Sequence, residues 1–464
     1  MRRLPTMLPS TTTRALLAAG LAGALIAGGS PATAAGAAPA RAPAQAPGEV
    51  IVRYEPGTTR LQRARLQRAA GVGAPRAFAP RTRTLRIRDG QSVAATLAEL
   101  RGRPGVAHAV ANSVARLSAF VPDDPGRSGR AGGWQELQWN FAAGSGVDAP
   151  VAWENLRAAG RPGGRGVVVA VLDTGVAYTN QGRYRRSPEL SPRRFVRGYD
   201  FVDRDRFAED HEGHGTHVAS TIAESTNDGA GLTGLAYGAR IMPVRVLDAH
   251  GEGRVDQIAE GVRFAARRGA DVINLSFEFP TELTAGEIPD VIDAISYARR
   301  RGVLVVGASG NEARASVAYP ARASGVVSVG AVTEHGCLAE YSNDGPDLDL
   351  VAPGGGADAD LEDEPERCRP LDPQGRNIFQ TTFVRTSSVR QFGLPSRFRG
   401  TSMAAPHVSA TAALVIASRV LGRSPSPAAL ERHLEATAVD LGRPGPDRRY
   451  GAGLVNAGRA TAPR

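Results

Sequence analysis

Four polar residues along the sequence have the side chains that nucleophilic catalysis requires. Asp173 ends the apolar segment GVVVAVLD, His214 lies in GHGTHVA, Asn311 follows VGASG, and Ser402 lies in GTSMAAPH. Each alone has a simpler explanation, since Asp, Asn and Ser are common helix caps and turn residues. Together they supply a nucleophile, a base, a carboxylate to orient the base, and an amide to hold an oxyanion. This combination predicts attack of a serine hydroxyl on a carbonyl carbon.

Such a site needs a scaffold that brings four distant segments to one edge. Continuous apolar runs are typical of parallel strands that are covered on both faces, and they occur at 166–173, 239–247, 270–276, 303–309 and 325–332. Helical patterns alternate with them, for example VDQIAEGVRFAARRG and DVIDAISYARRRG. The alternation predicts an α/β fold, a doubly wound and mostly parallel sheet with helices on both faces. Functional groups of such sheets gather at the carboxyl ends of the strands.

The four segments also resemble a known family. VLDTG, GHGTHVA, GASGNEA and GTSMAAPHVSA are similar, in this order, to the Asp, His, Asn and Ser motifs of the subtilases, the subtilisin-like serine proteases. The similarity extends over about residues 134–460. It implies a serine endopeptidase in which Ser402 attacks the peptide carbonyl and His214 transfers the proton. Asp173 then orients the imidazole, and the side-chain amide of Asn311 binds the oxyanion.

Two other functions remain open at this stage. The chain could be a processing protease with a narrow specificity, or an inactive protein of the same fold that only binds a partner. The resemblance implies protein or peptide substrates. We interpret the other histidines of these motifs, His217 and His407, as structural.

One segment departs from the family pattern. Where subtilases have Ser-Leu-Gly-Gly to pair with extended substrate, this chain reads Ser-Phe-Glu-Phe from 276 to 279. We therefore expect the backbone to bind substrate and the subsites to be altered. The acidic residue of this segment either favours a basic substrate side chain or points into solvent. The residues predicted to bind substrate are Ser276, Phe277, Glu278, Ser309 and Gly310.

Two short loops resemble calcium sites of the family. DFVDRD contains Asp200, Asp203 and Asp205, and STNDGAGLTG contains Asn227 and Asp228. Oxygen ligands on short flexible loops suit Ca²⁺, so the resemblance implies structural calcium. Solvated acidic loops are the alternative.

The N-terminus has the features of an export signal. Arginines precede an apolar run at 15–29, and Ala32-Thr33-Ala34 fits a small-residue cleavage site. We expect secretion by the general or the twin-arginine route, with an uncleaved anchor as the alternative. In an exported chain the two cysteines, Cys337 and Cys368, are expected to pair, although two free thiols remain possible.

The rest of the N-terminal quarter is predicted to be a small α+β module. By position, size and pattern it resembles the inhibitory propeptide of subtilases, which implies an autoprocessed zymogen whose own propeptide is its intramolecular inhibitor. The predicted parts are a signal peptide at 1–34, a spacer at 35–47, the propeptide at 48–117, a linker with the maturation site at 118–133, and the catalytic domain at 134–464.

Charge argues against other classes of partner. The net charge is +10, and thirteen arginines against four acidic residues lie between 48 and 117, so the basic character is confined to the predicted propeptide and signal. Arginines are not interleaved with aromatic residues in the body of the chain, which argues against nucleic-acid binding. We also expect no membrane anchor after signal cleavage, and a monomer.

Overall fold

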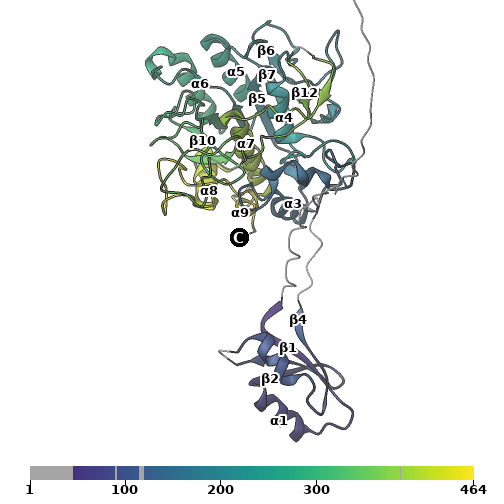
Figure 1. The fold of residues 1–464 in the computed structure, drawn as a ribbon. Helices are drawn as coiled ribbons and strands as arrows, with labels where there is room; N and C mark the ends of the chain where they lie inside the picture. The colour runs from purple at the N-terminus through teal and green to yellow at the C-terminus, as the bar shows by residue number, and fades with distance from the viewer. Residues whose placement is uncertain (1–44, 89–90, 114–119, 371–372, 387, 464) are drawn as a thin grey trace, which may run out of the picture. The chain divides into compact units, whose positions relative to one another are not determined.

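The computed structural model describes residues 45–88, 91–113, 120–370, 373–386 and 388–463. The chain forms two compact units, Met1–Leu117 and Ser118–Arg464. The division falls at the predicted end of the propeptide module (Figure 1). In the described residues no helix has both the length and the apolar character needed to cross a bilayer.

The first unit is a four-stranded antiparallel sheet with two helices. Its strand order is β2-β3-β1-β4, and side chains such as Val50, Val52, Leu85 and Leu97 form a separate core. Strand β2 was not predicted, because its residues VGAPRAFA include a proline and are mostly exposed. The elements are β1 (Gln45–Tyr54), α1 (Arg60–Ala69), β2 (Val72–Ala79), β3 (Thr82–Ile87), α2 (Val93–Leu100) and β4 (Val106–Ser113).

The second unit is built on a seven-stranded parallel sheet with the order β11-β10-β9-β8-β5-β7-β6. The doubly wound α/β prediction is therefore confirmed. The strands are β5 (Val168–Asp173), β6 (Tyr199–Asp200), β7 (Arg240–Arg245), β8 (Val272–Leu275), β9 (Leu304–Ala308), β10 (Val326–Val332) and β11 (Leu350–Pro353). Strands β5, β8, β9, β10 and β11 are fully buried along their length, as expected for strands covered on both faces.

Helices cover both faces of this sheet. On one face α5 and α6 lie side by side and share a core with the strands (Figure 1). On the other face α7 packs against α4, α3 and several strands, and nearly all its side chains are buried. The helices of this unit are α3 (Ala149–Ala158), α4 (His214–Ala223), α5 (Val255–Arg267), α6 (Pro289–Arg300), α7 (Thr401–Ser418), α8 (Pro427–Thr437) and α9 (Ala457–Ala460).

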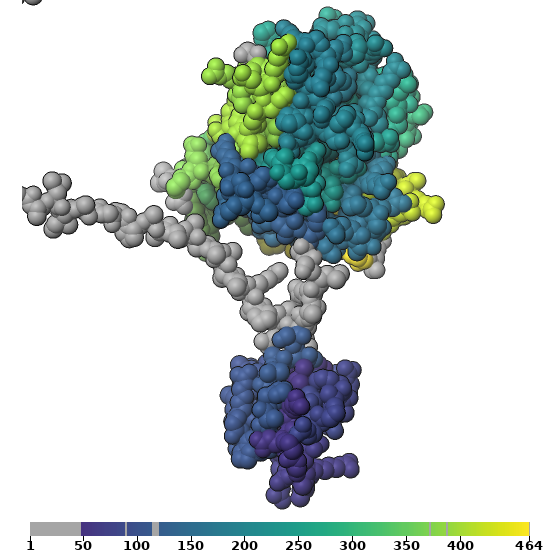
Figure 2. Space-filling model, turned by 90° about the vertical axis from the view of Figure 1, so that its right-hand side faces the viewer, coloured from purple at the N-terminus to yellow at the C-terminus, as the bar shows by residue number. Residues whose placement is uncertain are grey.

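The long segment between β11 and α7 is more ordered than its composition suggests. It contains a small hairpin of β12 (Thr382–Phe383) and β13 (Phe392–Gly393), and it lies on the surface of the second unit, coloured yellow-green in Figure 2. Its residue Asp358 is 4% exposed and accepts a hydrogen bond from His335 at 2.8 Å.

The predicted linker 118–133 is also part of the second unit rather than a free connection. The ring of Phe120 packs against Trp153 at 6.2 Å between centroids, and the guanidinium of Arg157 lies over it at 4.6 Å. The indole N–H of Trp134 donates to the carbonyl of Pro122 at 3.1 Å. From Phe120 onward the chain is therefore packed into the second unit.

Candidate active site

The site begins at the carboxyl end of the central strand β5. Asp173 is the last residue of this strand and is fully buried, and His214 is the first residue of α4. His214 Nδ1 lies 2.7 Å from Asp173 Oδ1. A Cβ at Gly215 would lie 2.0 Å from the carbonyl oxygen of Gly175, so only glycine permits the helix to approach the strand this closely.

The environment of His214 raises its basicity. Partial burial alone lowers the pKa of the imidazole, whose side chain is 23% exposed. The Asp173 carboxylate opposes this through its charge and hydrogen bond, and Glu212 and Asp210 add to it, so that the pKa of His214 is raised to about 9. A strongly stabilised imidazolium suits a group that must accept a proton during the reaction.

Two acidic residues directly before α4, which were not predicted as part of the site, hold the start of this helix. Glu212 Oε2 accepts the backbone N–H of His214 at 2.8 Å, and Asp210 accepts the N–H of Thr216 at 2.9 Å. Both carboxylates satisfy N–H groups of the first helical turn, which have no partner within the helix. The signal was present, because acidic residues directly precede the motif GHGTHVA.

Ser402 and Asn311 are held together at the same edge of the sheet. Ser402 is the second residue of α7, and Asn311 lies three residues beyond the end of β9. Asn311 Oδ1 accepts the backbone N–H of Thr401 at 2.8 Å and its hydroxyl at 3.1 Å. Because the oxygen is engaged, the amide presents its two Nδ2 hydrogens, the donors that an oxyanion requires.

A proline inside α7 leaves the Ser402 carbonyl without its helical partner. Pro406 has no N–H to donate to the residue four positions earlier, which is Ser402. The hydroxyl of Ser276 takes that place and donates to the Ser402 carbonyl at 2.8 Å. Ser276 in turn accepts from Asn274 Nδ2 at 2.8 Å. Its side chain therefore anchors the turn of α7 that carries Ser402, a role that the sequence did not reveal.

The other predicted substrate residues flank this site. Phe277 packs against the core shared by α5 and α6. Ser309 is buried and its hydroxyl donates to the carbonyl of Asn343 at 2.9 Å. Glu278 turns toward the site rather than into solvent, and its Oε2 accepts from Asn311 Nδ2 at 3.4 Å. Gly310 lies next to it with φ +116°.

The remaining two histidines of the motifs are buried in structural contacts. Burial lowers the pKa of His217 to about 3 and that of His407 to about 4. His217 Nε2 lies 3.1 Å from the carbonyl of Ile378, and His407 Nε2 lies 2.8 Å from Asn140 Nδ2. Both rings are therefore neutral at physiological pH.

In the first predicted calcium loop, an arginine side chain already pairs with two of the carboxylates. The guanidinium of Arg245 lies 2.8 Å from Asp200 and 2.6 Å from Asp203. Asp205 instead accepts the backbone N–H of Phe207 at 2.7 Å. Two of the three proposed ligands are thus ion-paired within the protein.

Near the second predicted loop lie carboxylates that form no ion pair with a basic side chain of the described residues. The backbone N–H groups of Asn227 and Asp228 donate to Asp124 at 2.9 and 3.2 Å. Glu189 lies within electrostatic range of Asp124 and Asp228, and its Oε2 is buried without a hydrogen-bond partner in the part of the chain that the structure describes. Burial and then these neighbours raise the pKa of Glu189 to about 7, and the pKa of Asp124 is raised to about 6. Carboxylate oxygens are the ligands that a hard divalent cation such as Ca²⁺ prefers.

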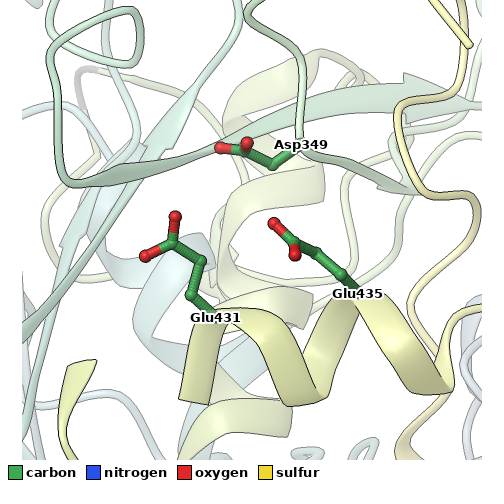
Figure 3. Close-up of side chains that lie close together, drawn as sticks. All are labelled: Asp349, Glu431 and Glu435. Atoms are coloured by element: carbon green, nitrogen blue, oxygen red, sulfur yellow. The ribbon is translucent and has the colours of Figure 1, made fainter. Parts of the chain in front are cut away.

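Two further clusters lie away from the site. Cys337 and Cys368 are joined by a disulfide. Asp349, Glu431 and Glu435 place carboxylate oxygens within 4.8 Å of one another (Figure 3). Asp349 precedes β11, at the amino end of the parallel strands. Glu431 is already paired with Arg299 at 2.6 Å.

Comparison with known proteins agrees with this geometry. The Subtilase family model matches residues 164–453. Subtilisin BL from Lederbergia lenta is 37% identical over 298 residues, which cover 64% of this chain and 91% of that protein. The thermophilic serine proteinase from Bacillus sp. (strain AK1) is 32% identical over 369 residues, covering 79% of this chain and 77% of that protein.

Solved structures agree as well. A protease from Pseudoalteromonas arctica is similar with a TM-score of 0.58 and 30% identity, and the match covers 74% of this chain and 99% of that one. The chain belongs to the subtilase family and is a subtilisin-like serine endopeptidase.

Proposed function

We propose that this chain hydrolyses peptide bonds through an acyl-enzyme formed on Ser402. His214 accepts the Ser402 proton and returns it to the leaving amine, while Asp173 fixes the imidazole tautomer and stabilises the imidazolium. Asn311 Nδ2 and the Ser402 backbone N–H, at the start of α7, bind the oxyanion. The observation that carries the proposal is the 2.7 Å contact between Asp173 and His214 at the sheet edge that also holds Asn311 and Ser402.

A serine-directed reagent tests this proposal. We expect a sulfonyl fluoride to attach to Ser402, as located by peptide mass spectrometry, and to block the hydrolysis of casein. Labelling of Ser402 in a chain that cuts only its own N-terminal segment would support a narrow processing protease instead. A chain that takes up no label and cuts nothing would be an inactive binding protein.

We further propose that the chain is made as an exported zymogen. The basic N-terminal unit has its own core, as an independently folding propeptide requires. The contacts of Phe120, Pro122 and Asp124 with the catalytic body argue that maturation removes residues before Phe120 rather than cutting within 120–133.

Calcium is proposed to bind at the loop 227–228, held by Asp124, Glu189 and Asp228. A divalent cation there would offset the repulsion that raises the pKa values of Glu189 and Asp124. When bound, the calcium ion would stabilise the fold and would take no part in catalysis.

Chelation is expected to lower the thermal midpoint of the chain by several degrees. A ligand at a hundred times its dissociation constant contributes about 2.7 kcal/mol, and about 1 kcal/mol shifts a large domain by roughly 2–4 °C. Calorimetry of the Ser402→Ala chain, with and without EDTA, avoids self-digestion. Glu189→Gln should abolish the response and Asp203→Asn should retain it. A response lost only in Asp203→Asn would place the ion at the loop 200–205.

A further inference from the structure

The carboxylate of Glu278 lies beside the amide that serves the oxyanion. Its Oε2 accepts from Asn311 Nδ2 at 3.4 Å. Asn311 cannot turn away without losing the two hydrogen bonds that its oxygen accepts from Thr401. A Cβ on Gly310 would lie 2.9 Å from the same Glu278 oxygen, so the carboxylate occupies the space between the segments 276–279 and 309–311.

This carboxylate has no counterion of its own. Among the described residues no basic side chain forms an ion pair with Glu278, and Arg314 lies instead 3.8 Å from Glu282 and from Glu312. Burial, opposed by the hydrogen bonds from Asn311, raises the pKa of Glu278, and the negative charge of Glu312 adds to the effect. The charge next to the oxyanion donor is therefore uncompensated.

An uncompensated negative charge here opposes the reaction. Glu278 engages one of the two Nδ2 hydrogens of Asn311 and leaves the other for the oxyanion, but its charge repels the negative charge that develops on the carbonyl oxygen. A positive charge on the substrate would offset this repulsion. The carbonyl under attack has its carbon at Ser402 and its oxygen at Asn311, so a long flexible side chain on the same substrate residue can reach Glu278.

We propose that Glu278 makes this protease selective for Arg or Lys at the substrate residue whose carbonyl is attacked, the P1 residue. The inference rests on the proposed function, because it requires Ser402 and Asn311 to be the reacting groups. The ionic contact is made in the bound substrate, which lowers KM. Neutralising the Glu278 charge weakens its repulsion of the oxyanion, which exists only near the transition state, and this raises kcat.

The test compares peptides that differ only at P1, with Arg, Lys, norleucine or Glu, in the mature enzyme. The variants are Glu278→Gln and the control Glu282→Gln. Glu282 is 74% exposed at the side chain and does not contact Asn311, so its substitution removes one local charge without touching the site. Titration with the sulfonyl fluoride gives the concentration of functional sites in each variant.

We expect the wild type to prefer Arg and Lys over norleucine by at least about tenfold in kcat/KM, the range of close charge pairs at interfaces. Glu278→Gln should lose most of this preference and cleave the norleucine peptide at least as fast as the wild type. Glu282→Gln should keep the preference.

The possible outcomes distinguish a failure of the proposed P1 selectivity from a failure of the proposed hydrolysis at Ser402. Enzyme that is labelled and active but shows no preference for a cationic P1 residue overturns the role of Glu278 alone, as does a preference that survives in Glu278→Gln. A chain that neither takes up label nor cuts any peptide overturns the proposed function, and this inference with it.

Discussion

Ser402→Ala is expected to abolish peptide hydrolysis and to leave the full-length chain uncut. Loss of the nucleophile in subtilisin lowers turnover on the order of 10⁶-fold, and we expect a loss of that size here. The methyl group of alanine fits the site, because Ser402 contributes its carbonyl and not its hydroxyl to the contact with Ser276. Mass spectrometry of the variant and of the wild type shows whether each chain removes its own N-terminal unit, and this removal reports both activity and maturation.

The wild-type chain should lose its N-terminal unit, and the mature chain should begin at or before Phe120. Ser418→Ala is a matched control, since Ser418 lies at the far end of the same helix, and that chain should mature normally. If the Ser402→Ala chain is shortened as well, another protease performs maturation. If the wild type cleaves peptides but keeps its N-terminal unit, the zymogen proposal is wrong although the nucleophile is right.

The parts of the site that are local in sequence could be predicted. Asp173 ends a recognisable buried strand, and His214 and Ser402 each lie at the start of a recognisable helix. The structure places all three at these positions, at one edge of the sheet. The α/β sheet followed from apolar runs that alternate with helical patterns. The strand β6 was missed because its two residues carry no pattern, and β11 was missed because its short apolar run ends in a proline that three glycines follow.

What could not be predicted depends on contacts between distant segments. Ser276 and Ser402 are 126 residues apart, and the carbonyl that joins them is free only because Pro406 lacks an N–H. Asp124 accepts a hydrogen bond from Asn227, 103 residues away, and no local sequence pattern indicates such a contact. The direction of the Glu278 side chain was left open for the same reason, since it depends on the position of Asn311.

Asp173→Asn is expected to lower kcat on the order of 10⁴-fold while leaving the fold intact. Asparagine can present its NH2 instead of an oxygen to His214 Nδ1, so the imidazole tautomer with its free Nε2 is no longer fixed, and such a substitution in a triad has a cost of this order. The pH dependence should change as well. With a His214 pKa of about 9, the neutral imidazole becomes more abundant as the pH rises toward 9, so the wild-type rate should climb over that range.

Glu212→Gln separates the two contributions of negative charge at His214. Its amide oxygen can still accept the His214 N–H, whereas the charge that helps to raise the pKa of the imidazole is gone. The alkaline rise of kcat/KM should therefore move to lower pH in both variants, but only Asp173→Asn should lose most of its rate at every pH. Asp256→Asn, on the exposed surface of α5, should change neither. A rise near pH 9 that does not move in either variant would belong to a different group, and the charges around His214 would then not set the working pH of this enzyme.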